Sequence, residues 1–207
     1  NFSTIINQFK DEKFIRYTEI EQKLKQLYRT GYFSSVEAQI TGETNGATIN
    51  FMAHSNEVLE NVVSNSSYPF LTNKINEFKL QNKNTVLNLN KCFKFYENLL
   101  QELRENNLSL VEIDKFYFNH ASGTLEVYFT EGRIDSLEIS GNKKSNDNLI
   151  LREISFENNE PVKKDDLEKS LKNVIGTNLF KQVSFDFDFS KKKFHPNMKI
   201  RVVERCA

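Results

Sequence analysis

The stretch VIGTNLFKQV at Val174–Val183 is the most informative part of the sequence about the fold, because two related stretches occur earlier in the chain. They read LYRTGYFSSV at Leu27–Val36 and LRENNLSLV at Leu103–Val111. Each follows a helical pattern and precedes two stretches of alternating apolar and polar residues. The three copies begin 76 and 71 residues apart, and periodicity at this scale indicates a repeated supersecondary unit. Repeated small modules usually bind or scaffold, since a catalytic site is seldom copied three times.

The last module, residues 132–207, predicts the element order β-α-α-β-β. Its first strand stops at a Gly-Asn turn signal, and its second helix ends near Gly176. The predicted elements are a strand Arg133–Ser140, a short helix with Ser145 as N-cap, a helix carrying Leu167, Leu171 and Val174, and two strands, Ser184–Phe189 and Met198–Val203. The turn between those strands falls at Lys191–Lys193.

The middle module, residues 56–131, repeats this order with a longer helix. Its predicted elements are a strand Val58–Val63, a short helix capped by Thr72, a helix with Leu89, Phe93, Tyr96, Leu100 and Leu103 on one face, and a hairpin of Asp114–Phe118 with Thr124–Thr130. The predicted fold class is therefore α+β, a tandem array of small β-α-α-β-β modules. Each module is expected to hold a three-stranded mixed sheet with two helices on one face.

The first module, residues 1–55, is expected to lack its beginning, as if cut from a longer protein. A capping-box spacing from Thr18 to Glu21 predicts the start of one helix. The strands Val36–Ile40 and Thr48–Ala53 then form a hairpin. Only Asn1–Tyr17 precede the helix, too few for the strand, helix and loop of a complete module.

Charge and hydropathy exclude several classes of partner. The 28 basic and 28 acidic residues cancel and are interspersed, whereas a nucleic-acid groove is expected to leave a basic excess. The loops between the paired helices also lack the glycines of RNA-binding KH domains. No apolar run approaches the ~18–20 residues that span a bilayer. We therefore expect no nucleic-acid partner and no membrane span within this chain.

The sequence contains no pattern that carries known chemistry. GxGxxG, P-loop, HExxH, CxxC and GxSxG patterns are all absent, and His54, His120 and His195 lie far from one another. Cys92 is expected to be a buried thiol and Cys206 a thiol near the chain end. We expect no catalytic residue, no cofactor-binding residue and no metal site, and therefore no enzyme within these 207 residues.

The repeated block resembles a known family. In the last module a Gly-Asn turn ends the first strand, the long helix leads to Gly176–Phe180, and the module closes with Val202-Val203-Glu204. This pattern is similar to POTRA domains, the periplasmic modules of Omp85-superfamily outer-membrane proteins. Asn178 stands where the family more often has glycine, and the middle copy, Asn106–Ser109, lacks both the glycine and the phenylalanine. The residues that match the family as structural positions are Gly31, Phe33, Val36, Gly141, Asn142, Phe180 and Val183.

The resemblance implies a location and two alternative roles. POTRA arrays lie in the periplasm as part of a cell outer-membrane protein, and a C-terminal β-barrel is expected to follow Glu204. Such arrays receive unfolded or extended polypeptide clients, or position accessory proteins, in a BamA-like assembly or translocation factor. Alternatively, Ile150–Glu153 and Leu103–Glu131 are similar to POTRA regions of patatin-like proteins, whose serine hydrolase domain lies upstream. The modules could also act only as spacers.

One segment is a candidate partner-binding strand. Lys115, Phe116, Tyr117 and Phe118 put aromatic side chains at three consecutive strand positions. Because successive side chains of a strand point to opposite faces, at least one aromatic must point away from the core. We predict that this strand is a sheet edge that holds an extended peptide by β-augmentation. The alternatives are packing against a neighbouring module and a misplaced strand.

Overall fold

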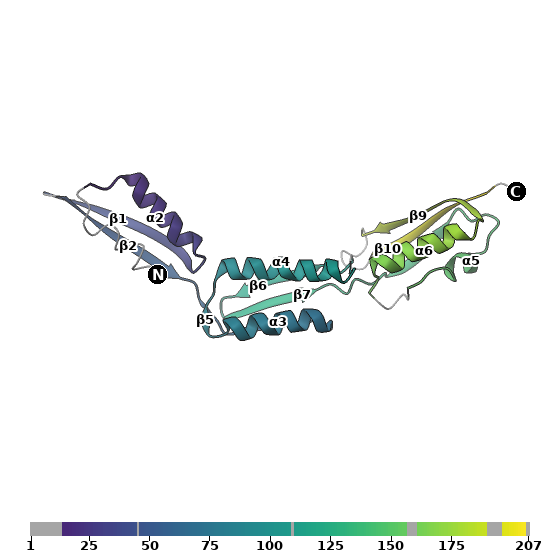
Figure 1. Ribbon diagram of the computed structural model, residues 1–207, viewed down its shortest axis with the longest axis horizontal. Helices are drawn as coiled ribbons and strands as arrows, with labels where there is room; N and C mark the ends of the chain where they lie inside the picture. The colour runs from purple at the N-terminus through teal and green to yellow at the C-terminus, as the bar shows by residue number, and fades with distance from the viewer. Residues whose placement is uncertain (1–13, 45, 109, 157–160, 190–195, 206–207) are drawn as a thin grey trace. The chain divides into compact units, whose positions relative to one another are not determined.

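The computed structural model describes residues 14–44, 46–108, 110–156, 161–189 and 196–205 (Figure 1). Its contacts form two compact units. The first comprises the chain up to Val63 with Thr72–Asn98 and Tyr117–Glu126, and the second comprises Ser64–Leu71, Leu99–Phe116 and the chain from Val127 onward. The elements are described below in chain order.

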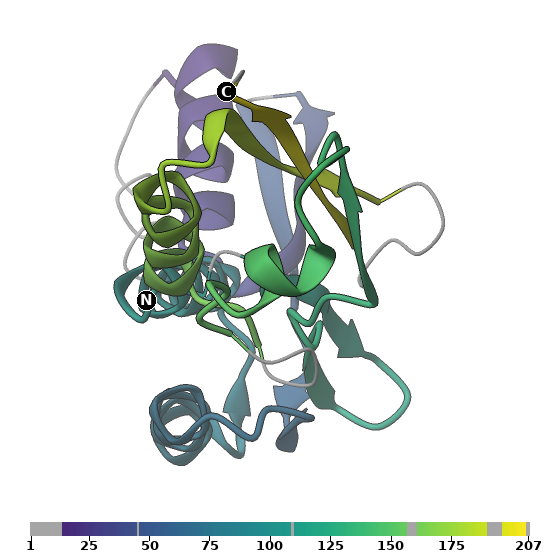
Figure 2. The ribbon, with the colours of Figure 1, turned by 90° about the vertical axis from the view of Figure 1, so that its right-hand side faces the viewer.

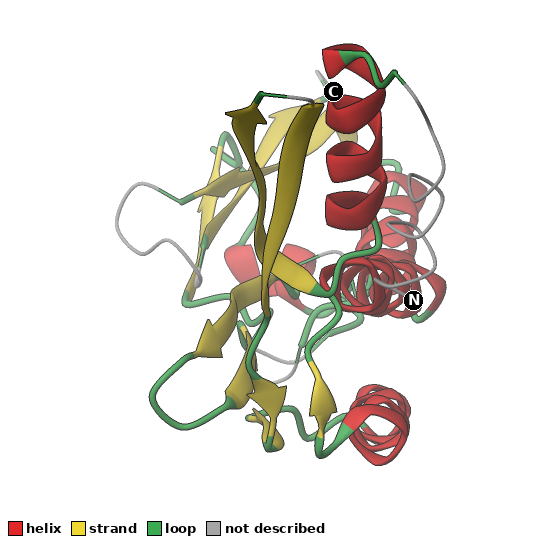
Figure 3. Cartoon of the chain, turned by 90° about the vertical axis from the view of Figure 1, so that its left-hand side faces the viewer, coloured by secondary structure: helices red, strands yellow, loops and turns green. Residues whose placement is uncertain are grey.

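The first elements are a helix and a hairpin. Helix α2 (Tyr17–Arg29) lies against the hairpin of β1 (Phe33–Glu43) and β2 (Gly46–Ser55), as Figure 3 shows. The strands pair antiparallel, with Ile40 opposite Ile49. The buried side chains of α2 are Ile20 and Leu27, seven residues apart on one helical face.

The predicted start of α2 is wrong by two residues. The N-cap is Arg16, not Thr18. The backbone N–H of Arg16 donates to Glu19 Oε2 at 3.0 Å, so the reciprocal bond of a capping box forms two residues earlier than the Thr18–Glu21 spacing suggests. Both strands of the hairpin also extend beyond the predicted ranges.

The predicted strand Val58–Val63 is two strands. β3 (Val58–Leu59) pairs antiparallel with β5 (Thr85–Val86), a pairing that the sequence did not indicate, and β4 (Asn61–Ser64) joins a different sheet. Helix α3 (Pro69–Asn82) begins at its proline, so the predicted cap at Thr72 is wrong. Proline suits a first helical position because the N–H that it lacks would have no partner within the helix there.

Helix α4 (Leu89–Glu105) presents a different face to the core from the predicted one. The buried side chains are Cys92, Phe95, Leu99 and Leu103, whereas Phe93 is 63% exposed. The predicted face is therefore correct at Leu103 and wrong at Leu89 and Phe93. Cys92 is a buried thiol as predicted, and burial raises its pKa to about 11. Cys206 lies outside the described residues.

The next sheet has three strands, as predicted. β6 (Ile113–Asn119) and β7 (Thr124–Phe129) follow α4, and the strand order is β4-β7-β6. β7 lies in the centre and buries the alternate residues Leu125, Val127 and Phe129.

The last elements confirm the β-α-α-β-β order with a mixed sheet. They are β8 (Ser136–Ser140), α5 (Asp147–Leu151), α6 (Lys164–Gly176), β9 (Phe180–Asp188) and β10 (Asn197–Glu204). β10 pairs parallel with β8 and antiparallel with β9. The N-cap of α5 is Asn146, whose side chain accepts from the backbone N–H of Asn148 at 3.0 Å, so the predicted cap at Ser145 is wrong by one residue. The turn predicted at Lys191–Lys193 lies outside the described residues.

The two faces of this last sheet differ in chemistry. Figure 2 shows α6 covering one face, and the buried cluster beneath it includes Ile150, Val174 and the alternate β10 residues Met198, Ile200 and Val202. The residues between them on β10 point to the other face. There Lys199 Nζ lies 3.6 Å from Asp188 Oδ2, and Arg201 Nε lies 3.4 Å from Asp186 Oδ2. The opposite face therefore carries cross-strand ion pairs.

Candidate functional site

The predicted partner-binding residues lie together on a sheet edge. Lys115, Phe116, Tyr117 and Phe118 all belong to β6, so the strand is correctly placed in the sequence. In the order β4-β7-β6, this strand is at the end of its sheet. Among the described strands, none lies beyond it. A strand in this position presents one row of backbone groups that an extended chain can pair with.

The side chains of β6 alternate between the two faces of the sheet. Phe116 and Phe118 are half-buried, whereas Tyr117 is 49% exposed. Tyr117 is therefore the aromatic residue that points away from the core. An aromatic ring beside a sheet edge offers apolar contact to a side chain of an added strand, and its hydroxyl stays in water.

Charged and aromatic groups flank this strand at both ends. The Phe118 ring meets the His120 ring edge-to-face, with centroids 5.3 Å apart. His120 Nδ1 lies 2.7 Å from Glu57 Oε2, with both side chains exposed. In the second unit, the Lys115 ammonium lies 5.7 Å from the centroid of the Tyr128 ring. These contacts hold the side chains of the edge in place.

The end of the long helix has the same geometry in all three repeats of the block. The residue four positions after Leu27, Leu103 and Val174 has a positive φ in each copy: 78° at Gly31, 59° at Asn107 and 59° at Asn178. Its backbone N–H donates to the carbonyl three residues earlier in each copy, at 3.0, 3.0 and 3.1 Å respectively. The middle copy lacks the glycine, but asparagine adopts the same left-handed conformation there.

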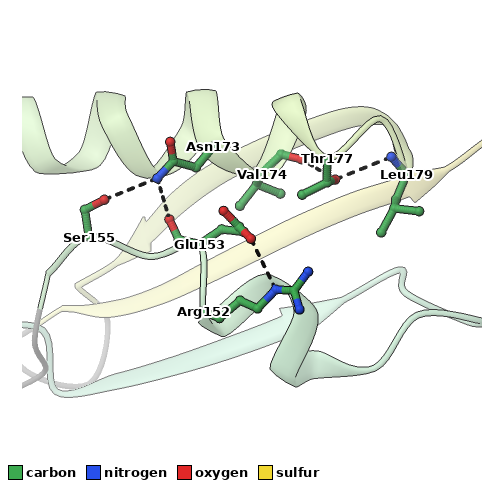
Figure 4. Close-up of polar contacts among 7 residues, drawn as sticks. All are labelled: Arg152, Glu153, Ser155, Asn173, Val174, Thr177 and Leu179. Atoms are coloured by element: carbon green, nitrogen blue, oxygen red, sulfur yellow. Dashed lines mark hydrogen bonds and ion pairs between the residues drawn. The ribbon is translucent and has the colours of Figure 1, made fainter.

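The residue before this position also bonds to its own helix. The Thr30 hydroxyl donates to the Leu27 carbonyl at 2.6 Å, and the Thr177 hydroxyl donates to the Val174 carbonyl at 2.7 Å. Figure 4 shows the second contact, together with the bond from the Leu179 N–H to the Thr177 hydroxyl. In the middle copy the Asn106 side chain donates to a helix carbonyl instead, at 2.9 Å.

Figure 4 also shows how α6 is tied to the segment that follows α5. The Asn173 amide donates to the Glu153 carbonyl at 3.2 Å and to the Ser155 hydroxyl at 3.4 Å. The Arg152 side chain lies 3.2 Å from the Glu153 carboxylate. These are contacts between exposed or half-buried groups that position a loop, and they hold no constellation suited to catalysis.

The residues that match the family occupy structural positions. Phe33 and Phe180 begin β1 and β9, and Phe180 is buried in the core of the last sheet. Val36 lies opposite Ala53, and Val183 lies opposite Val202. Each follows a helix end by the same number of residues, so each enters a sheet in the same register relative to its helix.

The turn after β8 depends on Gly141 and Asn142. Gly141 has φ of 94°, as its position before Asn142 suggests, and an added Cβ would overlap the carbonyl oxygen of Val202. The Asn142 amide donates to the Ser145 carbonyl at 3.0 Å and to the Asp147 carboxylate. The turn is thus fixed both by its backbone conformation and by a side chain.

A carboxylate at the end of β10 closes the same turn. The Glu204 carboxylate accepts the backbone N–H of Lys144 at 3.0 Å and of Ser145 at 2.7 Å. Burial alone raises the pKa of Glu204, but the hydrogen bonds from Ser145 and Lys144 and the Lys144 charge together lower it below its ordinary value. No pattern in the sequence indicates this contact, since the partners are about 60 residues apart.

Helix ends also bond to the first residue of the next long helix. In the first unit, the Gly31 carbonyl accepts the backbone N–H of Leu89, the first residue of α4, at 2.9 Å. In the second unit, the Asn107 carbonyl accepts the backbone N–H of Lys164, the first residue of α6, at 2.8 Å. The left-handed residue therefore connects successive repeats in both places.

Asparagine side chains reinforce the first of these connections. The Asn56 amide donates to the Gly31 carbonyl at 2.9 Å and to the Leu87 carbonyl at 2.8 Å. The amides of Asn88 and Asn90 donate to the carbonyls of the last α2 turn, at 2.9 and 2.8 Å. Asn88 and Asn90 thus supply donors at the end of α2, where the last carbonyls of a helix have no partner within it.

No group of three or more potential metal ligands occurs in the part of the chain that the structure describes. Within the same residues, no helix combines the length and the apolar composition that crossing a membrane requires.

Comparison with known proteins shows the fold. No protein-family model and no curated protein sequence matches the chain. Among solved structures, the N-terminal domain of Omp85 from the cyanobacterium Thermosynechococcus elongatus matches with a TM-score of 0.80 at 18% identity, covering 99% of this chain and 92% of that one. POTRA domains 1–3 of the periplasmic domain of Omp85 from Anabaena match with a TM-score of 0.68 at 18% identity, covering 99% and 88%.

A third solved structure has a similar architecture. CdiB from Escherichia coli matches with a TM-score of 0.54 at 13% identity over 91% of this chain and 35% of its own length. The chain thus spans about a third of the CdiB structure. The described chain has the fold of tandem POTRA domains, which confirms the resemblance found in the sequence.

Proposed function

We propose that this chain is a periplasmic POTRA array of an outer-membrane protein and that it receives extended polypeptide segments without catalysing a reaction. The fold supports this proposal, since the Anabaena structure of the same fold is a periplasmic domain of Omp85. Its clients would be polypeptides on their way to outer-membrane assembly or secretion, with accessory proteins and an attached β-barrel as further partners. The array would comprise three modules, 1–55, 56–131 and 132–207.

The observation that carries this proposal is the placement of β6 at a sheet edge with Tyr117 pointing outward. Pairing through backbone groups suits a receptor for many sequences, because it does not depend on the side chains of the client. The patatin-like alternative concerns a hydrolase domain outside these 207 residues. It leaves the role proposed for β6 unchanged.

Titration of the labelled chain with a short uncharged peptide of alternating threonine and valine tests this function. We expect amide chemical-shift changes to concentrate on Asp114–Asn119, because an added strand pairs with this edge. A peptide of the same length with alternate prolines lacks the backbone donors and should not bind. Shift changes that fall on other strands, or no binding of the first peptide, would refute the role of β6.

A matched pair of variants distinguishes peptide binding at the β6 edge from non-specific binding to exposed aromatic side chains. Tyr117→Ala should weaken binding, since it removes the aromatic side chain beside the edge. Tyr17→Ala, on α2, removes an aromatic side chain that is even more exposed and should leave binding unchanged. Equal effects of the two substitutions would mean that the peptide binds through exposed rings rather than through the β6 backbone.

A further inference from the structure

A second candidate site lies on the helices rather than on a sheet edge. Side chains of helices α3 and α4 line an open groove with a volume of about 310 Å³. The groove is formed by residues of the first unit. The side chains that matter to its chemistry are Lys74, Phe78, Asn82, Lys91, Lys94 and Phe95.

Two stripes at helical spacing build the groove. Lys74, Phe78 and Asn82 lie four residues apart along α3, and Lys91 and Phe95 lie four apart along α4. The α3 stripe covers eight residues, about 12 Å at 1.5 Å per residue. An extended chain rises about 3.3 Å per residue, so the groove has room for about four residues of a peptide.

The floor of the groove is aromatic. The Phe78 and Phe95 rings stack with centroids 4.1 Å apart and planes 8° from parallel, and both side chains are buried. Asn82, which is 6% exposed, donates from its amide to the Phe78 carbonyl at 2.8 Å. Its Oδ1 accepts the Lys91 ammonium at 3.0 Å, which fixes this positive charge beside the floor.

The walls carry an excess of positive charge. Three lysines, Lys74, Lys91 and Lys94, line the groove together with a single acidic residue, Glu77. The Gln81 amide donates to this carboxylate at 3.2 Å. This excess is local, because the whole chain has a net charge of zero.

We propose that this groove binds an acidic segment of a partner polypeptide in an extended conformation. The lysines pair with aspartate or glutamate side chains, and the phenylalanine floor receives the apolar side chains between them. The lining contains no arginine, the residue whose planar guanidinium matches phosphate in two hydrogen bonds. The chemistry therefore favours a carboxylate-bearing peptide over a phosphate. This site lies on elements other than β6 and does not depend on the function proposed for that strand.

The test is a titration of the labelled chain with an acetylated, amidated hexapeptide of alternating aspartate and phenylalanine. We expect shift changes on Lys74–Asn82 and Lys91–Asn98, and an affinity that falls as salt is added. A peptide of alternating asparagine and phenylalanine should bind more weakly. Chemical-shift changes confined to Asp114–Asn119 would overturn the proposal that the groove binds the peptide. Equal affinities for the two peptides would overturn it as well. Inorganic pyrophosphate serves as a further probe, and equal competition by it would show an anion site without peptide recognition.

Two matched variants decide whether the groove lysines act. The double variant Lys91→Gln, Lys94→Gln should lower the affinity for the aspartate peptide about fivefold, since each exposed ion pair contributes only modestly to the binding free energy. Lys169→Gln with Lys172→Gln removes two exposed lysines at the same spacing on α6 and should leave the affinity within about twofold. Lys74→Gln with Lys94→Gln keeps the Lys91–Asn82 bond and repeats the test if the first variant unfolds. Equal affinities across the variants would overturn the proposal.

Discussion

At the scale of single residues, two glycines of the last module have opposite requirements. Gly141 has a positive φ, and its missing side chain leaves room for the Val202 carbonyl oxygen. Gly176 is the last residue of α6, and an added Cβ there would meet nothing within 4 Å. The first position therefore requires glycine for two reasons, and the second does not require it.

We expect Gly141→Ala to lower the free energy of unfolding by about 2–4 kcal/mol, through backbone strain and overlap with Val202. Gly176→Ala should leave it unchanged or raise it by about 0.5 kcal/mol, because alanine loses less backbone entropy in a helix than glycine does. Urea unfolding of both variants measures the difference. Similar stabilities for the two would mean that the turn after β8 rearranges to admit a side chain.

The helix ends show how far single residues could be predicted. Gly31 matches the family at the helix end and Asn178 stands in place of the family glycine, and the backbone is left-handed at both. The middle copy matched weakly because it lacks the phenylalanine as well as the glycine, yet Asn107 has the same φ as Asn178. Asparagine and glycine are different residue types, but both adopt the left-handed backbone conformation. A comparison of residue identities therefore underestimates the similarity of the middle repeat to the others.

At the scale of elements, the order of the described helices was predicted more reliably than the face that each one buries. α4 carries apolar residues on two overlapping stripes, one with Leu89 and Phe93 and one with Cys92 and Phe95. Both have helical spacing, so periodicity alone could not choose between them. Which stripe of α4 is buried depends on where the neighbouring strands lie, and the local sequence of the helix does not contain that information.

The predicted helix starts were wrong by one to four residues. Ser145 and Asn146 before α5 are both good capping residues, whereas α2 is capped by Arg16, which is not a preferred one.

The contact between β10 and the turn after β8 has a predictable pH dependence. The hydrogen bonds that Glu204 accepts from Lys144 and Ser145 need its charged form, and its pKa in the folded chain is below the ordinary value of 4.5. A carboxyl group with a lowered folded pKa stabilises the fold above its unfolded pKa, and this contribution is lost as the pH falls through the folded value.

We therefore expect Glu204→Gln to be less stable than the native chain at pH 6 to 7, with a difference that shrinks below pH 4.5. Thermal unfolding of both proteins across pH 3 to 7 measures this. Hydrogen exchange at the Lys144 and Ser145 amides should accelerate in the variant at neutral pH. A stability difference that stays constant with pH would show that the Glu204 charge plays no part in the contact.

At the scale of the whole molecule, the repeat predicted the tandem fold because it copies helix ends and strand entries together. It did not predict the connections between repeats. Asn56 and Gly31 are 25 residues apart, and Asn107 and Asp165 are 58 apart, yet the two residues of each pair are hydrogen-bonded to each other. Contacts of this kind join a side chain to a distant carbonyl or carboxylate and leave no periodic pattern in the sequence.

The two candidate binding sites differ in how far they could be predicted from the sequence. The run Lys115–Phe118 predicted a strand with an outward aromatic, and β6 has one in Tyr117. The groove between α3 and α4 was not predicted, because the lysines on each helix are what a solvated helix face also shows. Only the packing of the two helices brings Lys74 and Lys91 to the same groove.

The last prediction concerns the connection at the end of α2. The half-buried Asn56 amide donates to two carbonyls, of Gly31 and Leu87, so Asn56→Ala leaves both without this donor. We expect a loss of about 1–2 kcal/mol and faster hydrogen exchange at the last turn of α2. Asn90→Ala removes one bond from an exposed side chain, which water replaces, and should cost less than about 0.5 kcal/mol. If both variants melt at the same temperature, Asn56 does not hold the helix end.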